Sequence, residues 1–329
     1  MKQRSRWERL SNILIALGGN AILQPGQKGT YEEQLQNISI SCGKLVKLYM
    51  SGYRMAITHG NGPQVGNLLI QNQRANDILP MQPLYSCVAQ TQGQIGFMIQ
   101  SVLENQFRLK GLEVHAPVIL TRVLVDAVDP AFSKSTKPIG PFFDEEYAKE
   151  KITQGETWMQ DSNRGWRKVV PSPRPVKILE LDIIRQTLDQ NGITIAVGGG
   201  GIPVISKGEQ VVGVEAVIDK DLAGSLLARE LEVDAFVILT DVAHAKINYG
   251  QPNEVDLTHI TIEEAESYLA AGQFGVGSMA PKVQAAVEFV RYTGKRAIIT
   301  SLEGIEAAIK GEIGTIITNS PRYDVTPKS

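Results

Sequence analysis

Cysteine and histidine, the side chains that most often mark metal centres and redox sites, are scarce in this sequence. Its 329 residues include two cysteines, Cys42 and Cys87, and four histidines. The cysteines form no CxxC pair and lie in apolar, helix-like stretches, so we expect small buried core residues. The histidines show neither an HExxH motif nor paired spacing, which argues against a zinc enzyme. So few cysteines also favour a reducing compartment.

Charge of one sign and long apolar runs are lacking too. The chain has 33 basic and 35 acidic residues, a formal net charge of −2, so no overall positive field points to nucleic acid or an anionic membrane. The apolar run at residues 13–17 is too short for a signal peptide and far below the roughly 20 residues that span a bilayer. We therefore expect a cytoplasmic protein with no nucleic acid and no membrane partner, and a flexible leader at residues 1–12.

The familiar nucleotide-binding signatures are missing as well. No GxxxxGK[ST] loop occurs, which excludes a P-loop protein, and no GxGxxG opens a helix after a strand, which argues against a Rossmann dehydrogenase. The HRD and DFG motifs of protein kinases are also absent. Any site for phosphate must therefore be built in another way.

What the sequence does contain is a regular alternation of two kinds of segment. Short apolar, β-branched runs predict strands at 13–17, 54–58, 114–125, 193–197, 236–240, 296–300 and 315–318. Apolar residues at helical spacing predict helices within 35–49, 88–110, 221–231, 261–271, 281–293 and 303–310. Most of the strand runs are apolar on both faces. The alternation predicts an α/β fold built around a mainly parallel sheet.

Residues 126–177 interrupt this alternation. They carry the prolines Pro130, Pro138, Pro141, Pro171, Pro173 and Pro175, and they follow neither a helical nor a strand period. A long irregular stretch inside a compact domain is usually functional, for example a lid. Because Trp158, Trp166 and nearby phenylalanines give this segment apolar surface to bury, we expect a folded insertion rather than a disordered linker.

Glycine follows three of the expected strands. The segments are Gly18-Gly19-Asn20, Gly60-Asn61-Gly62 and Gly198 to Gly201. In open α/β sheets, ligands bind outside the carboxyl ends of the strands. Glycine at these places lets backbone N–H groups approach a phosphate closely. Three such segments in one sheet predict an anion-binding edge.

Three lysines occupy settings that are unusual for surface lysines. Lys137 lies in TKPIGPF within the insertion, Lys220 lies between Asp219 and Asp221 before an expected helix, and Lys282 lies in GVGSMAPK before another. A single lysine of this kind would be interpreted as solvated. All three together, at loop-to-helix junctions or in a rigid insertion, indicate a site.

Lysines without a histidine base suit phosphoryl transfer to a carboxylate-type oxygen. The nucleophile is already anionic, so no proton has to be removed, and the obstacle is repulsion between this anion and a polyanionic triphosphate. Catalysis is then mostly positioning and neutralisation by lysine, Mg²⁺ and backbone N–H groups. His59 precedes the second glycine segment, but no partner acid or base is evident, so we expect a structural role for it.

Seven strings resemble, in the same order, the motifs of carbamate kinases, a family of the amino-acid-kinase superfamily. They are ALGGNAIL (16–23), THGNGPQVG (58–66), TKPIGPF (136–142), RGWRKVVPSPRP (164–175), GGGGIPV (198–204), GVEAVIDKDLA (213–223) and GSMAPKV (277–283). The resemblance extends from about residue 12 to residue 318. GNGPQVG, VPSPRP and EAVIDKDLA are specific to this family rather than to the wider superfamily.

This resemblance implies an open three-layer αβα sandwich with a small protruding subdomain. Residues 13–320 would form one amino-acid-kinase-like domain, with the acceptor bound by 13–192 and the nucleotide by 193–320, and the insertion at 126–177 would be a lid. The implied activity is reversible phosphoryl transfer between ATP and carbamate, with Mg²⁺ carried by ATP or ADP. Family members are homodimers and typically make ATP from carbamoyl phosphate in the breakdown of arginine or related nitrogen compounds.

The resemblance also assigns roles to individual residues. Lys220 and Lys282 would bridge the nucleotide phosphates and the migrating group, Asp221 would position them, and Lys137 would reach the carbamate. The residues expected to hold the phosphoryl group and the acceptor are Gly18, Gly19, Asn20, Gly60, Asn61, Gly62, Gly199 and Gly200. Those expected to bind the nucleotide are Asp219, Asp241, Tyr249, Gly277, Ser278, Met279 and Lys282.

Three positions depart from the usual family pattern, all on the nucleotide side. Ala280 stands where glycine is common, Gly224 where serine or threonine is common, and Ala243 where an acidic or polar residue is frequent. They bear on nucleotide affinity rather than on the reaction. Two alternatives stay open at this point: a kinase of another small carboxylate, such as an N-acyl amino acid, and a catalytically silent nucleotide-binding regulator.

Overall fold

The computed structural model describes residues 11–161, 165–275 and 277–320. In this part of the chain, the central element is an eight-stranded sheet with the order β15-β17-β16-β12-β1-β2-β9-β3. Neighbouring strands pair in parallel, apart from β16 and β17. The strands are β1 (Asn12–Leu17), β2 (Arg54–His59), β3 (Val118–Ile119), β9 (Ile193–Ala196), β12 (Ala235–Thr240), β15 (His259–Thr261), β16 (Arg296–Ser301) and β17 (Thr315–Thr318). The α/β class with a mainly parallel sheet is confirmed.

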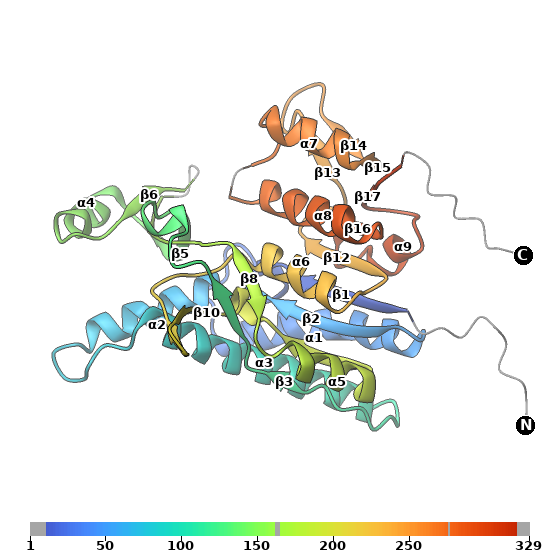
Figure 1. Ribbon diagram of the computed structural model, residues 1–329, viewed down its shortest axis with the longest axis horizontal. Coiled ribbons are helices and arrows are strands. Elements are labelled where there is room, and N and C mark those ends of the chain that lie inside the picture. The colour runs from blue at the N-terminus through green and yellow to red at the C-terminus, as the bar shows by residue number, and fades with distance from the viewer. Residues whose placement is uncertain (1–10, 162–164, 276, 321–329) are drawn as a thin grey trace, which may run out of the picture.

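Helices cover both faces of this sheet because its strands are apolar on both faces. In β1, Ile13 and Ile15 pack against α1, α3 and α9, whereas Leu14 and Ala16 belong to the apolar cluster of α5, α6 and α8. These helices are α1 (Tyr31–Met50), α3 (Leu84–Arg108), α5 (Leu181–Asn191), α6 (Lys220–Glu230), α8 (Met279–Thr293) and α9 (Ile305–Ile309). The result is a three-layer αβα sandwich (Figure 1) with an apolar core on each side of the sheet.

The strand order decides where the glycine segments lie. β12, β1, β2 and β9 are adjacent and parallel, so their carboxyl ends meet at one edge of the sheet. Residues 18–20 follow β1, residues 60–62 follow β2 and residues 198–201 follow β9. The three glycine segments are therefore neighbours at that edge.

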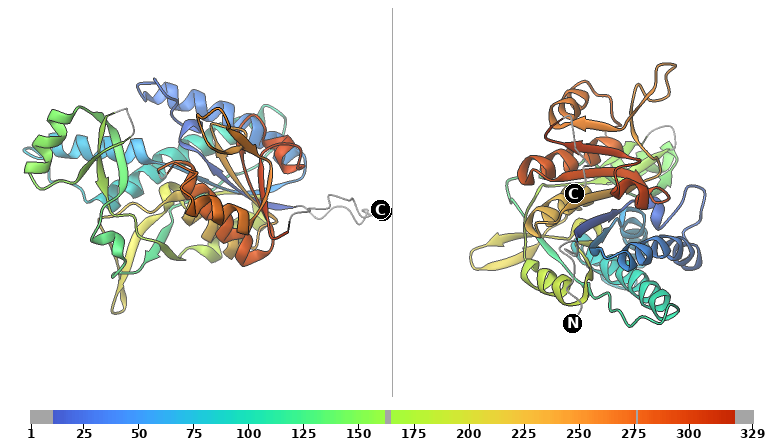
Figure 2. Two further views of the ribbon diagram at one scale, coloured as in Figure 1. Left: turned by 90° about the horizontal axis from the view of Figure 1, so that it is seen from above. Right: turned by 90° about the vertical axis from the view of Figure 1, so that its right-hand side faces the viewer.

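A protruding subdomain, formed by residues 137–161 and 165–170, stands apart from the sandwich. It consists of the three-stranded sheet β5-β7-β6 and one helix, α4. The bounds are β5 (Lys137–Phe143), α4 (Glu145–Thr153), β6 (Trp158–Gln160) and β7 (Trp166–Val170). It projects to the left in Figure 1 and in the left view of Figure 2. The stacked rings of Phe143 and Tyr147, 4.3 Å between centroids, and the edge of Trp158 form its own small core.

A second sheet lies where the subdomain joins the sandwich. Its order is β11-β10-β4-β8, with β4 (Arg122–Val125), β8 (Pro175–Ile178), β10 (Ile202–Lys207) and β11 (Gln210–Gly213). The last part of the insertion expected at 126–177 thus supplies β8 to this sheet, and its residues 162–164 lie outside the described residues. Residues 1–10 of the expected leader also lie outside them, and Asn12 begins β1.

The described residues form further elements. They are α2 (Gly62–Arg74), α7 (Ile262–Ala270), the hairpin of β13 (Ala245–Ile247) and β14 (Val255–Leu257), and the short turns η1 (Gly19–Ala21), η2 (Pro130–Phe132) and η4 (Gly198–Gly200). In the described ranges, every helix is too short or too polar to cross a lipid bilayer. Both cysteines are buried and carry free thiols.

The prediction of a single strand at residues 114–125 is wrong. The chain forms two short strands there, β3 and β4, which belong to different sheets. Between them lies Thr121, fully buried, whose hydroxyl donates to the Ile119 carbonyl at 2.7 Å and accepts from the Val197 N–H at 3.0 Å. An apolar run cannot reveal this break, because the polar contact comes from a residue 76 positions away.

Thr121→Val should therefore destabilise the fold although it preserves the shape of the side chain. The buried Val197 N–H would lose its acceptor, which costs about 1–3 kcal/mol in unfolding free energy. Chemical denaturation measures this loss. The control is Thr153→Val at an exposed threonine of α4, which should cost less than about 0.5 kcal/mol. Equal losses in the two variants would contradict the explanation.

Candidate active site

One buried carboxylate, that of Asp221, holds two ammonium groups. Asp221 is 3% exposed and lies in the first turn of α6. Its Oδ1 accepts a hydrogen bond from Lys220 Nζ at 2.5 Å, and its Oδ2 accepts one from Lys282 Nζ at 2.9 Å. Lys220 begins α6, whereas Lys282 lies in the first turn of α8. The contact therefore joins the N-terminal ends of two helices that pack against each other.

The neighbouring acidic residue, Asp219, receives the third lysine. Asp219 is the N-cap of α6, and its Oδ1 accepts from the backbone N–H groups of Asp221 at 2.9 Å and Leu222 at 3.3 Å. Its Oδ2 pairs with Nζ of Lys137, the first residue of β5 in the protruding subdomain. The cap fixes this carboxylate, because both backbone donors belong to the helix. Three lysines from distant parts of the chain thus meet two carboxylates.

Burial and opposite charges act against each other on the two aspartates. Burial tends to raise the pKa of Asp221, but the ammonium groups of Lys220 and Lys282 hold it well below its ordinary value. Burial also tends to raise the pKa of Asp219, and Lys137 nevertheless lowers it. Both carboxyl groups are therefore ionised at neutral pH and make charge-assisted hydrogen bonds to the lysines.

The two lysines on Asp221 differ in their electrostatic environment. Burial lowers the pKa of Lys220 to about 8 against the opposing effect of Asp221, and the charge of Lys282 adds to the lowering. Burial also tends to lower the pKa of Lys282, but Asp221 more than compensates and raises it. Three lysines against two aspartates leave one positive charge in excess, which suits an anionic ligand.

Two glycine segments lie directly against this cluster and need their lack of side chains. A Cβ at Gly60 would lie 3.3 Å from Cδ of Lys220, so the lysine stem runs along the second segment. A Cβ at Gly199 would overlap the side-chain amide of Asn61. Gly200 has a φ of +92°, and a Cβ there would overlap the carbonyl of Ile218, which precedes Asp219. The segments 60–62 and 198–201 are thus brought together with Lys220.

The side chains of the second segment are held from α3 and from the third segment. Asn61 Nδ2 donates to Thr91 Oγ1 at 2.9 Å, and Thr91 is fully buried. His59 is 1% exposed with its ring against Gly198, and burial lowers the pKa of this histidine to about 4. His59 is therefore neutral at physiological pH. Its expected structural role agrees with this environment.

The first glycine segment continues from the end of β1 and lies next to the end of β12. A Cβ at Gly18 would lie 2.5 Å from the carbonyl oxygen of Leu239, so only glycine fits there. Gly19 is exposed and Asn20 is half-buried within η1. Their backbone groups are therefore accessible at the same edge of the sheet as the lysine cluster. Gly62, the remaining glycine expected in this group, begins α2.

Of the residues expected on the nucleotide side, Asp219 and Lys282 belong to the lysine cluster itself. The others lie further out, and within the described ranges no hydrogen bond or ion pair joins them to the cluster. Asp241 follows β12 and accepts from the Thr240 hydroxyl at 3.0 Å, and Tyr249 is 72% exposed. Gly277 and Ser278 are exposed, and Met279 begins α8. Residue 276, within the expected loop, lies outside the described residues.

Sequence reasoning missed the side chains that support the glycine segments. Besides Thr91, they include Gln92, whose side-chain amide donates to the Thr121 carbonyl and accepts from the Thr121 N–H at 3.0 and 2.9 Å. This residue links α3 to the turn between β3 and β4. A glutamine inside a long helical pattern gives no signal for this, because only the tertiary fold brings the two segments together.

Comparison with known proteins identifies the family of this chain. The amino acid kinase family profile matches residues 12–301. The chain belongs to the amino acid kinase family. Within it, the chain is 48% identical over 310 residues to the carbamate kinase of Thermococcus kodakarensis, covering 93% of this chain and 98% of that protein. It is 47% identical over 309 residues to carbamate kinase 1 of Enterococcus faecium, with 93% and 98% covered.

A solved structure agrees with this membership of the family. The carbamate kinase of Giardia lamblia bound to AMP-PNP superimposes with a TM-score of 0.87 at 43% identity, covering 94% of this chain and 99% of that chain. The resemblance to carbamate kinases, the αβα fold that it implied and the expectation of a kinase are therefore confirmed.

The lowered pKa of Lys220 predicts a pH dependence of ligand binding. Below about pH 8 its ammonium group is charged and attracts phosphate, and as the pH rises through about 8 the charge is lost. Affinity for ADP, measured by titration calorimetry, should therefore fall between pH 7 and 9. Arginine stays protonated throughout this range. In Lys220→Arg the affinity should change much less with pH, and an equal fall in both proteins would exclude Lys220 as the cause.

Proposed function

We propose that the protein catalyses reversible transfer of a phosphoryl group between ATP and carbamate. The observation that carries this proposal is the meeting of Lys137, Lys220 and Lys282 at two ionised aspartates beside the glycine segments. The similarity to carbamate kinases supports the choice of carbamate as the acceptor.

In the proposed reaction, a carbamate oxygen forms a bond to the γ-phosphorus while the oxygen that bridges the β- and γ-phosphates leaves with ADP. Lys220 and Lys282 neutralise phosphate oxygens on either side of this transfer. Because both ammonium groups are held by Asp221, their positions are set before the substrates arrive, and no reorganisation is needed during the reaction. Lys137 supplies a third cation, for the carboxylate of carbamate.

The glycine segments complement the lysines. Backbone N–H groups of residues 18–20 and 60–62 would bind the transferring phosphoryl group, with Gly199 and Gly200 packed behind them. Carbamate is already an anion, so the reaction needs no general base. The neutral, buried His59 is consistent with a site that moves no proton.

Magnesium fits this site as part of the nucleotide. In the described ranges, no group of three or more His, Cys, Asp or Glu side chains could form a metal cage, and Asp219 and Asp221 already bind lysines. This donor set suits a Mg²⁺ ion held by phosphate oxygens and water. When bound, the ion would neutralise part of the charge on the phosphates.

We further propose a cytoplasmic homodimer that works mainly toward ATP synthesis from carbamoyl phosphate, in the breakdown of arginine or related nitrogen compounds. The family resemblance supports these points. The proposed division into an acceptor part, 13–192, and a nucleotide part, 193–320, agrees with the origin of the cations: Lys137 belongs to the first part, and Lys220 and Lys282 to the second. Residues 126–177 would act as the lid over the acceptor.

A coupled assay tests the proposed reaction. Purified protein should form ATP from ADP, Mg²⁺ and carbamoyl phosphate. If ADP binds normally and no ATP forms, the protein would be a silent nucleotide-binding regulator instead. If a panel of carboxylates assayed with ATP shows transfer to an N-acyl amino acid and none to carbamate, the acceptor would be misassigned.

Replacement of each lysine should separate the roles. Lys220→Ala and Lys282→Ala should each lower kcat by about 10²–10³-fold, because each removes a cation from the transferring group. Lys137→Ala should mainly raise KM for carbamoyl phosphate. The control is Lys149→Ala, whose side chain is 69% exposed on α4. Steady-state kinetics of ATP formation measure these effects, and full activity in all three site variants would show that the site lies elsewhere.

A further inference from the structure

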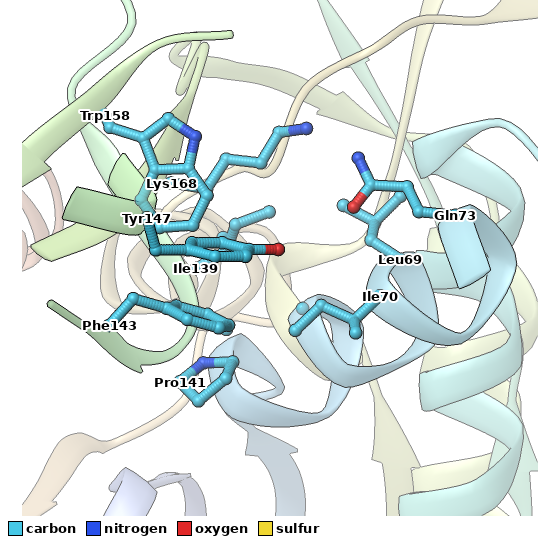
Figure 3. Close-up of a pocket in the computed structure, with 11 residues that line it drawn as sticks. Leu69, Ile70, Gln73, Ile139, Pro141, Phe143, Tyr147, Trp158 and Lys168 are labelled. Atoms are coloured by element: carbon cyan, nitrogen blue, oxygen red, sulfur yellow. The ribbon is translucent and has the colours of Figure 1, made fainter. Parts of the chain in front are cut away.

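One face of α2 holds the protruding subdomain against the sandwich. From this helix, Gly66, Leu69, Ile70 and Gln73 point the same way, because residues three or four apart lie on one side of a helix. They line a small cavity (Figure 3) whose other wall comes from the subdomain: Ile139, Gly140, Pro141, Phe143, Tyr147, Trp158 and Lys168. The subdomain thus meets α2 along the C-terminal part of the helix, from Gly66 to Gln73.

At one end of this contact, two glycines touch backbone to backbone. A Cβ at Gly66 would overlap the backbone of Gly140, which itself has a φ of +73°. The adjacent Ile139 is buried in one cluster with Val65 and Leu69 of α2. Strand β5 is therefore pinned at residues 139–140, next to Lys137. With no side chain between the two backbones, this contact can serve as a pivot.

At the other end, Gln73 reaches across to Glu156 of the subdomain. Gln73 Nε2 donates to Glu156 Oε1 at 2.9 Å. Glu156 Oε2 accepts from Trp158 Nε1 at 2.9 Å and pairs with Lys168 Nζ at 3.1 Å. Burial tends to raise the pKa of Glu156, but these hydrogen bonds and the charge of Lys168 lower it, so the acceptor of Gln73 is ionised. Hydrogen bonds to ionised groups are about twice as strong as neutral ones.

The three-stranded sheet of the subdomain links the position of Glu156 to that of Lys137. Trp158 of β6 pairs with Lys168 of β7, and Lys168 pairs with Ile139 of β5. Lys137 lies two residues before Ile139 on the same strand. Because backbone hydrogen bonds make the three strands one unit, holding Glu156 in place would restrict rotation of this unit about the glycine contact.

We propose that Gln73 is a positioning residue for the reaction. By holding Glu156, it sets the orientation of the subdomain in which Lys137 reaches Asp219 and the acceptor. The same helix begins at Gly62, the last residue of the second glycine segment, and its last turn carries the contact of Gln73 with Glu156. α2 thereby sets the position of the second glycine segment relative to Lys137. The kinetic part of this inference rests on the proposed function, whereas the structural part stands without it.

Kinetics with matched variants test the proposal first. Gln73→Leu keeps the size of the side chain and removes the donor, whereas Gln71→Leu makes the same change on the exposed face of α2. Since a hydrogen bond to a charged group is worth about tenfold in an equilibrium constant, KM for carbamoyl phosphate should rise about tenfold in Gln73→Leu. Affinity for ADP alone should stay unchanged, and Gln73→Lys, which restores a donor to Glu156, should recover most of the loss.

A distance measurement tests the proposal independently of activity. Spin labels at Ile152→Cys on α4 and Val255→Cys on β14 occupy exposed positions, and the native Cys42 and Cys87 are buried. The distance distribution between the labels should be broader in Gln73→Leu than in the parent or in Gln71→Leu. The distance measurement does not depend on catalysis. If the parent makes no ATP, that result refutes the proposed function alone, and the label distances still test the role of Gln73.

Three results would overturn the proposal. The first is a Gln73→Leu protein with the same KM and the same label distances as Gln71→Leu. The second is a lower melting temperature with unchanged KM and distances, which would show that Gln73 contributes to stability only. The third is a raised KM without any change in the distance distribution, because Gln73 would then act without moving the subdomain.

Discussion

The bond of Lys220 and Lys282 to Asp221 is the interaction on which the rest of the site depends. Ammonium groups buried close together would repel each other and lose their protons, and a carboxylate that is 3% exposed would be equally unfavourable alone. Each charge is stable only because the other is present. The same contact joins the first turns of α6 and α8, so the electrostatics of the site and the packing of these helices cannot vary independently.

The lysine cluster in turn imposes limits on the segments around it. The stem of Lys220 lies along Gly60, and Gly200 lies against Ile218, just before the cap residue of α6. A Cβ at Gly60 would crowd the stem of Lys220, and one at Gly200 would overlap the carbonyl of Ile218. Glycine here serves to bring side-chain charges and backbone N–H groups to the same place. The two means of stabilising negative charge, lysine ammonium groups and backbone dipoles, are then available to one ligand.

Local sequence patterns predicted the sheet, the glycine segments at its edge and the three lysines, because each is encoded by neighbours in the chain. They failed where a contact spans the fold. The break at Thr121 depends on Val197, and α2 was missed because Gly62 and Pro63 open it directly after a glycine segment. The pairing of Lys137 with Asp219 joins residues 82 positions apart. The expected place of Asp219 at the nucleotide stays a prediction; the structure adds that this residue caps α6 and pairs with Lys137.

Under the proposed function, the excess of one positive charge would let the site bind two anions and still release a product. Asp221 and Asp219 pair with all three lysines, yet two carboxylates do not fully balance three ammonium groups. In the proposed reaction, phosphate oxygens would compete with Asp221 and Asp219 for the same ammonium groups, and this competition would limit how tightly the ligands are held. Lys137 differs from the other two because it arrives on a separate subdomain. The position of its ammonium group relative to the other two therefore depends on the orientation of that subdomain. The contact between α2 and the subdomain thus affects the electrostatics of the site as well as the packing.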